Sequence, residues 1–228
     1  MTRPRVTPRV APLEAYARWA ATFDCEDSAI VALETRSLIP RMPQIAGKRF
    51  IDIGCGTGRW LRWSVERGAR AAGVDLSLPM LREAERKSQV AGRVAHGDAL
   101  RAPFPDGCAD IVLSTLALGH IRPIEAAMEE LARIAAPGAT VLITDFHPDA
   151  LRRGWKRTFQ NRGETIEMES EPYSIAELHH RRLEMLEFHE AGFEEPERPI
   201  FEAADKSAMF EQVRGQTAIF LARFRRVG

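Results

Sequence analysis

Glycines and carboxylates occur in this chain at spacings that could bind a nucleotide-type ligand. Three glycines stand at every second position directly behind the apolar run "RFIDI": Gly54, Gly56 and Gly58. Because they lack side chains, the backbone can approach a ligand closely and offer it the amide groups of a helix N-terminus. The carboxylates belong to Asp52, Asp75 and Asp98. The pattern predicts a ligand-binding loop and leaves open which nucleotide it holds.

Two common nucleotide loops do not fit these residues. A phosphate-binding P-loop requires Gly-Lys-Ser/Thr, whereas Gly58 is followed by Arg59 and Trp60. A dinucleotide fingerprint, GxGxxG, would place its third glycine at position 59. The remaining candidate is an acidic residue followed by GxGxG.

The three carboxylates indicate which ligand suits that third loop. Asp75 lies 21 residues after Gly54, where a carboxylate can accept hydrogen bonds from both ribose hydroxyls of an adenosine cofactor. Asp98 can receive the exocyclic amine of an adenine. Asp52 would repel a pyrophosphate but attract an ammonium group. A nucleoside that carries an amino acid in place of phosphates is S-adenosylmethionine.

The elements that must position these residues alternate along the chain. Strands are predicted at "RFIDI", "RAAGVD", "GRVAHGD", "CADIVLSTLAL" and "ATVLITDF", and helices at "GRWLRWSVERG", "SLPMLREAERKSQV" and "PIEAAMEELARIA". Such alternation implies a parallel sheet with right-handed crossovers.

The flanking segments differ in character. Residues 11–40 are predicted to be helical, and "WKRTFQ" and "ETIEME" to form a hairpin around 161–163. A helix is predicted over 174–192, because Ser174 and Glu177 stand at capping-box spacing before it. The tail "QTAIFLARFRR" is predicted to be a last strand.

Composition narrows the class of protein. The chain has 228 residues, 45% of them hydrophobic, which suffices for one large domain. Lys+Arg and Asp+Glu both number 32, which argues against a basic nucleic-acid footprint. The three cysteines form no CxxC pair, and no apolar run approaches the ~20 residues of a spanning helix. We therefore expect a cytoplasmic protein whose basic start, "MTRPRVTPRVAP", is a loose arm and not a targeting peptide.

Five motifs in order resemble those of a known family. "IDIGCGTGRW", "GVDLSLPMLREAERK", "AHGDA", "FPDGCADIVLSTLALGHI" and "ELARIAAPGATVLITD" look like the successive motifs of class I S-adenosylmethionine-dependent methyltransferases. The similarity is greatest to the small-molecule branch that includes the ubiquinone/menaquinone-biosynthesis type, and it covers residues 48–147. It implies an α/β, Rossmann-like doubly wound sheet of seven strands with a reversed last strand and helices on both faces. The sequence departs from the family at "APGAT", where relatives more often have "KPGG".

The resemblance also implies a set of residues that bind the cofactor: Tyr16, Asp52, Gly54, Cys55, Gly56, Gly58, Asp75, Leu76, Met80, Asp98, Ala99 and Leu116. By this resemblance the glycines cradle the methionine moiety, Asp75 holds the ribose, and Leu76 and Met80 flank the adenine. Leu116 lies near the methyl group, and Tyr16 closes over the methionine end. Cys55 is expected to be a small filler, since nothing near it in the sequence would lower the pKa of its thiol.

Methyl transfer from a sulfonium requires little chemical assistance from the protein. A sulfonium is already a strong electrophile, so the main task is to place the acceptor in line with the methyl group and exclude water. A base is needed only if the acceptor must lose a proton. His120 and His147 are the candidate catalytic residues, with hydrogen-bonded structural histidines as the alternative. No ligand spacing supports a metal site.

One methyltransferase domain is expected over residues 1–228. An N-terminal arm and helical cap is predicted over 1–45 and a cofactor-binding core over 46–147. A substrate lid is predicted over 148–173, and a C-terminal helix with strands over 174–228. A basic cluster in the lid, "RRGWKR", either binds an anionic acceptor or forms a solvated face.

The residues after the fourth strand bear on the acceptor. "STLALGH" lacks the Asn/Asp-Pro-Pro-aromatic motif of enzymes that methylate adenine or glutamine amides, and the Pro-Cys motif of those that methylate cytosine rings. We therefore expect methyl transfer to the oxygen, nitrogen or carbon of a small metabolite, with S-adenosylhomocysteine as product, by a monomer or homodimer. The alternatives are use of the cofactor for other chemistry, a non-catalytic binding module, and methylation of RNA.

Overall fold

The computed structural model describes residues 7–25, 27–161, 163–171 and 173–228. The first six residues of the expected N-terminal arm and the turn position 162 lie outside the described residues. No helix in the described part of the chain is long and apolar enough to cross a membrane.

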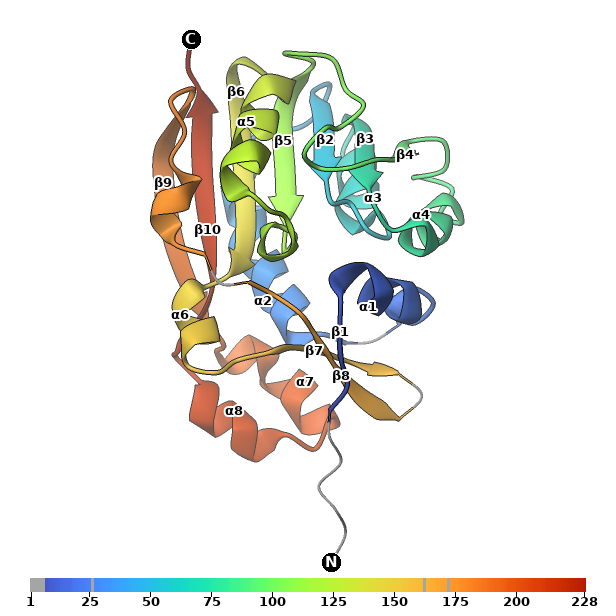
Figure 1. The fold of residues 1–228 in the computed structure, drawn as a ribbon, viewed down its shortest axis with the longest axis vertical. Coiled ribbons are helices and arrows are strands. Elements are labelled where there is room, and N and C mark those ends of the chain that lie inside the picture. The colour runs from blue at the N-terminus through green and yellow to red at the C-terminus, as the bar shows by residue number, and fades with distance from the viewer. Residues whose placement is uncertain (1–6, 26, 162, 172) are drawn as a thin grey trace, which may run out of the picture.

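A seven-stranded sheet forms the centre of the molecule (Figure 1). In spatial order its strands are β4 (Val94–His96), β3 (Arg70–Asp75), β2 (Arg49–Ile53), β5 (Ala109–Thr115), β6 (Ala135–Phe146), β10 (Thr217–Arg226) and β9 (Leu183–Gly192). The strands from β4 to β6 are parallel, and β10 runs antiparallel to both β6 and β9. The predicted Rossmann-like sheet with a reversed last strand is confirmed.

Helices cover both faces of this sheet. α5 (Ile124–Ile134) packs on one face, and α2 (Ala29–Leu38), α3 (Arg59–Val65) and α4 (Leu78–Glu85) pack on the other. Successive residues of a strand point to opposite faces, so Val112 of β5 faces α5 while Ile111 and Leu113 face α3. This two-sided burial explains why the strand segments are almost continuously apolar.

A second, small sheet includes the hairpin of the segment predicted to be the lid. It has the order β1-β8-β7, formed by β1 (Arg9–Val10), β7 (Arg157–Asn161) and β8 (Glu164–Met168). β7 and β8 pair antiparallel, which confirms the predicted hairpin. α1 (Pro12–Trp19) packs on this sheet in a separate apolar cluster. Figure 1 shows α1 and the small sheet gathered where the parallel strands of the large sheet end. We call β1, α1, β7 and β8 the lid module.

The helix predicted over 174–192 is wrong. The capping box forms, with the Ser174 amide donating to Glu177 Oε2 at 2.6 Å, but it begins only a 3₁₀ turn, Ile175–Leu178. The chain then continues as β9, which pairs along β10. Local capping favoured a helix, but pairing with a strand that would otherwise be a bare sheet edge decided the outcome.

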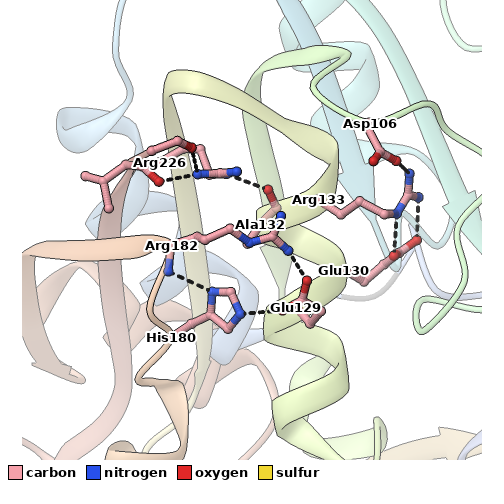
Figure 2. A network of polar contacts seen from close by, with 10 residues as sticks. Asp106, Glu129, Glu130, Ala132, Arg133, His180, Arg182 and Arg226 are labelled. Carbon is pink, nitrogen blue, oxygen red and sulfur yellow. Dashed lines mark hydrogen bonds and ion pairs between the residues drawn. The ribbon is translucent and has the colours of Figure 1, made fainter.

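Polar contacts with α5 hold this connection in place (Figure 2). His180 Nε2 lies 2.7 Å from Glu129 Oε2, and the same carboxylate accepts from the guanidinium of Arg182. Arg226, at the end of β10, donates from Nε to the carbonyl of Ala132 at 2.8 Å. His180 therefore lies in the connection to β9, not on a helix.

Short elements complete the chain. They are the 3₁₀ turns Ile39–Arg41, Leu118–His120 and Glu195–Glu197, and the helices α6 (Pro148–Arg152), α7 (Arg198–Ala203) and α8 (Ser207–Val213). α7 and α8, which the sequence reading missed, lie beside the lid module (Figure 1).

Candidate active site

A cavity of about 880 Å³ lies at the carboxyl edge of the parallel strands. The glycine loop and the ends of β3, β4 and β5 line one side of it, and α1, β7, α7 and α8 line the other. Ten of the twelve predicted cofactor residues line this cavity, whereas Asp52 and Gly58 do not. Ligands of open α/β sheets bind at this edge, so the cavity is the candidate active site.

The glycine loop is shaped by close packing against its neighbours. Gly54 has φ = 76°, and a Cβ built on it would lie 2.8 Å from Cβ of Ala117. Gly58, with the same φ, is the N-cap of α3 and packs against Val90. Only glycine fits both the left-handed backbone and the space. The amide of Gly56 faces Asp75 and donates to its Oδ2 at 2.8 Å.

Asp75 is held in place by the backbone. Its two carboxylate oxygens accept from the amides of Gly56 and Ser77, each at 2.8 Å. Burial raises the pKa of Asp75, and the hydrogen bonds from Ser77 and Gly56 oppose that rise. A carboxylate oxygen has two acceptor positions, so each can still accept a bond from a ribose hydroxyl in the cavity.

Asp52 lies in β2, 1% exposed, and its Oδ1 has no hydrogen-bond partner in the described part of the chain. Burial raises the pKa of Asp52 to about 8, against the opposing effect of the nearby charge of Arg59. An unpartnered buried carboxylate oxygen needs an explanation, and a cation near the glycine loop would supply one. This fits a ligand that carries an ammonium group.

The residues predicted for the adenine lie at one end of the cavity. Leu76 is half exposed, Met80 is buried, and both line the cavity together with Ala99. Asp98 is exposed, and its Oδ1 accepts from the amide of Leu100 at 2.9 Å. Its other oxygen is therefore available to an amine in the cavity.

Leu116 is strained. It has φ = 53°, in a region that residues other than glycine rarely adopt. Its amide donates to the carbonyl of Thr144 at 2.8 Å, and its carbonyl accepts from Arg157 Nη1 at 3.0 Å. Strain of this kind concentrates at functional sites, where surrounding contacts enforce it.

His120 and Tyr16 meet across the cavity, their ring centroids 5.6 Å apart and nearly perpendicular. Neither ring nitrogen of His120 makes a hydrogen bond of good geometry with a described residue. Burial, helped by the charge of Arg157 and opposed by the backbone of Glu169, lowers the pKa of His120 to about 2. Burial raises the pKa of Tyr16 to about 12. At neutral pH both side chains are therefore uncharged.

Arg157 and Asp145 form a buried ion pair that sequence reasoning missed. Arg157 is 6% exposed and Asp145 is fully buried. Asp145 also accepts from the amide of Gly119 at 2.6 Å and from the hydroxyl of Tyr173 at 3.3 Å. The pair joins the lid module to β6. Arg157 stood out only as one member of a basic cluster, and its partner is distant in sequence.

His147 does not line the cavity. It is the N-cap of α6, with Nδ1 accepting from the amide of Asp149 at 3.1 Å. Its Nε2 lies 2.8 Å from Glu190 of β9. Both ring nitrogens are therefore engaged in structural contacts, so we do not retain His147 as a candidate catalytic residue.

Two further features surround the site. Asp24, which follows α1, accepts from Thr57 Oγ1 at 2.8 Å and lies 2.6 Å from Lys87 Nζ, so it links the segment after α1 to the glycine loop. Cys55 is buried, and burial raises the pKa of its thiol well above the ordinary value, which suits a filler and not a nucleophile. No group of His, Cys, Asp and Glu among the described residues could hold a metal ion.

Solved structures share this fold. An S-adenosylmethionine-dependent methyltransferase from Mesorhizobium loti superposes with a TM-score of 0.67 and 20% identity, over 87% of this chain and 100% of that chain. Geranyl diphosphate C-methyltransferase from Streptomyces coelicolor A3(2), solved with S-adenosyl-L-homocysteine, superposes with a TM-score of 0.62 and 18% identity. The match covers 85% of this chain and 75% of that chain. These likenesses show that the chain shares the fold of both structures, with the sheet order described above.

Sequence comparison agrees with the fold. Residues 51–143 match the family described as "Methyltransferase domain", which supports the predicted resemblance. Malonyl-[acyl-carrier protein] O-methyltransferase from Pectobacterium atrosepticum is 31% identical over 63% of this chain and 57% of its own length. Demethylmenaquinone methyltransferase from Thermus thermophilus is 38% identical over 45% of this chain and 49% of its own length. The chain thus spans about half the length of these curated relatives.

Proposed function

We propose that this protein transfers the methyl group of S-adenosylmethionine to a small-molecule acceptor by direct in-line displacement. The observation that carries the proposal is a cavity that the glycine loop and Asp75 line together with the lid module and α7–α8. Such a cavity can hold a cofactor and an acceptor side by side and keep water out.

The residues present fit the cofactor. We assign its amino-acid end to the glycine loop with Asp52, its ribose to Asp75, and its base to the pocket around Met80. The unpartnered Oδ1 of Asp52 and the close contact of Gly54 with Ala117 support this assignment. When bound, the cofactor supplies an electrophilic methyl group on a sulfonium.

The chain itself then has to position the acceptor. Leu116 and His120, which follow β5, and Tyr16 from α1 line the part of the cavity next to the glycine loop. Since the pKa of His120 is lowered to about 2, it is a weak base, and we assign it to orienting the acceptor rather than to removing a proton from it.

Two other functions have less support. A [4+2]-cyclase has the same fold, with a TM-score of 0.65 over 100% of both chains, so the fold alone does not define the chemistry. Methylation of RNA would favour a basic surface, whereas Lys+Arg and Asp+Glu are equal in number and the cavity walls are rich in aromatic residues. A monomer or homodimer in the cytoplasm stays a prediction.

Calorimetry and product release test the proposal. We expect intact protein to bind S-adenosylhomocysteine in the micromolar range and Asp75→Ala to bind it at least 100-fold more weakly, because two ribose hydrogen bonds to a charged group are lost. Asp106→Ala, at an exposed aspartate outside the cavity lining, is the matched control. Intact protein that binds neither S-adenosylmethionine nor its product would contradict the proposal. Binding without S-adenosylhomocysteine release over a broad acceptor panel would favour other chemistry.

A further inference from the structure

Hydrogen-bond donors without an acceptor converge on one part of the cavity. They are the imidazole of His120 and Nε of Arg157, both buried, and the hydroxyl of Tyr16, and we call them the donor cluster. The rings of Tyr16 and His120 are 5.6 Å apart. The guanidinium of Arg157 packs against Gly119, where an added Cβ would lie 2.5 Å from Nη2. The three side chains are therefore neighbours.

The protein satisfies the donor cluster only in part, because the backbone of Glu169 acts on His120 without a hydrogen bond of good geometry. Arg157 uses Nη1 for the carbonyl of Leu116 and Nη2 for Asp145, which leaves Nε without a partner in the described part of the chain. The hydroxyl of Tyr16 makes no hydrogen bond with any described residue. Buried polar groups are almost always paired, so a group from outside is expected to accept these bonds. Ionised carboxylates and phenolates accept hydrogen bonds without donating any.

An apolar chamber adjoins the donor cluster in the same cavity. It is lined by Trp155, Phe193, Ile200, Phe201, Met209 and Val213. The rings of Trp155 and Phe193 are stacked, with centroids 5.9 Å apart and planes 8° from parallel. Lys206 also lines the cavity, but its side chain is exposed. Aromatic and aliphatic walls of this kind favour an apolar body over a sugar or a nucleotide.

We propose that the methyl acceptor is an apolar molecule with one anionic oxygen, of the carboxylate or phenolate class. Its oxygen accepts hydrogen bonds from the donor cluster, and its body fills the apolar chamber. The inference deepens the proposed function and rests on it. The oxygen forms a bond to the methyl carbon while the sulfur–carbon bond breaks and its electron pair stays on sulfur. Anion and sulfonium thus become a neutral ester or ether and a neutral thioether, and no proton has to leave.

The protonation states agree with this geometry. With the pKa of Tyr16 raised to about 12 and that of His120 lowered to about 2, both stay uncharged donors at neutral pH. Neither can take a proton from the acceptor, so an acceptor that arrives ionised matches the site. The positive charges of Arg157 and Arg122 both lower the pKa of His120, and the two arginines pair with Asp145 and Glu171. The charges of Asp75 and Asp145 both raise the pKa of Tyr16, and that of Arg157 lowers it.

Binding of matched acids and amides tests the inference. Protein saturated with S-adenosylhomocysteine is titrated calorimetrically with 2-naphthoate and decanoate, and with 2-naphthamide and decanamide, which have the same bodies without the charge. 2,4-Dinitrophenolate distinguishes a phenolate site from a carboxylate site. We expect at least one anion class to bind 10-fold or more tightly than the amides. Equal binding of acids and amides, or no binding of any anion at millimolar concentration, would overturn the inference.

Substitutions in the donor cluster test whether its side chains cause the preference for anions. His120→Phe keeps an aromatic ring against Tyr16 but removes the donor, and we expect it to weaken anion binding about 10- to 100-fold and amide binding much less, because a carbonyl accepts a weaker bond than an anionic oxygen. His179→Phe, at an exposed histidine outside the cavity, is the control. Tyr16→Phe provides a second, conservative removal of a donor. If His120→Phe weakens S-adenosylhomocysteine binding by the same factor, the cluster serves the cofactor and the inference fails. Intact protein that does not bind S-adenosylhomocysteine contradicts the proposed function instead.

Discussion

At the scale of single residues, the glycine loop offers a test with an internal control. Gly54 and Gly47 have nearly the same backbone, φ = 76° and 75°, but a Cβ at Gly54 would meet Ala117 at 2.8 Å while one at Gly47 meets nothing within 4 Å. Gly47→Ala should therefore cost only the left-handed strain, roughly 1 to 2 kcal/mol.

Gly54→Ala should lower the free energy of unfolding by a further ~1 to 3 kcal/mol, because Ala117 has no flexible end that could move away. It should also weaken S-adenosylhomocysteine binding at least 10-fold, whereas Gly47→Ala should not. Chemical denaturation and calorimetry measure the two effects. Equal losses of stability in both variants would show that the contact with Ala117 is unimportant.

The raised pKa of Asp52 predicts that the stability of the protein depends on pH. Burial raises this pKa from the ordinary value of 3.8 to about 8, so the folded protein holds the proton more tightly than the unfolded chain. Asp52 thus contributes stability that is present below pH ~4 and is lost as the pH rises through about 8. Relative to Asp52→Asn, the ligand-free protein should lose stability across this range, measured by denaturation at each pH.

A cation bound beside Asp52 reverses this preference. The carboxylate must be ionised to attract the ammonium group of the cofactor, so the affinity for S-adenosylhomocysteine should rise by up to about 10-fold per pH unit between pH 6 and 8. Asp52→Asn should remove this slope. An unchanged slope in the variant would assign the titration to another group.

At the scale of elements, the link between the segment after α1 and the glycine loop should control cofactor binding. Asp24 bonds Thr57 and pairs with Lys87, and the side chains of Asp24 and Lys87 are partly exposed. Asp24→Ala should cost no more than about 1 kcal/mol of stability, as for other exposed pairs. It should still weaken S-adenosylhomocysteine binding several-fold, because the loop loses its support. Glu14→Ala breaks the exposed Glu14–Arg18 pair on α1 itself and should leave binding unchanged.

Elements with strong periodicity were predictable from sequence, and elements decided by distant partners were not. The alternating strands and helices around the glycine loop follow from local pattern, and so does the β7–β8 hairpin. At 174–192 a real capping box was present, but pairing with β10 prevailed over it. α7 and α8 are too short for their periodicity to stand out.

The same distinction applies to the site. The residues of the glycine loop and Asp75 are close in sequence and carry a motif, and the cavity brings them together. Arg157 and Asp145 are distant in sequence, and neither is unusual by itself. His147 follows a strand end as a ligand-binding residue would, but the start of α6 needed an N-cap there. Its role was therefore decided by a neighbouring element that the sequence did not reveal.

At the scale of the whole molecule, the lid module and the large sheet are two packed bodies that enclose the cavity. The lid module has its own apolar cluster, built around Phe159, Ile166 and Met168. The ring of Trp19 stacks on Phe159 at 5.0 Å and ties α1 to the hairpin. The buried Arg157–Asp145 pair joins this body to β6, and Asp145 in turn holds Gly119. Closure of the cavity and the position of the loop after β5 are thereby coupled.

Breaking the Arg157–Asp145 pair should destabilise the lid module more than the large sheet. Arg157→Met leaves Asp145 buried without its cation, which should cost roughly 3 to 5 kcal/mol of stability. The amides of β7 and β8 should exchange hydrogen faster while those of β5 and β10 change only with global stability. Arg157→Met combined with Asp145→Asn removes both charges and keeps an oxygen for the amide of Gly119, so most of the stability should return. A double variant as unstable as the single one would show that packing of Arg157, and not its charge, holds the lid to the sheet.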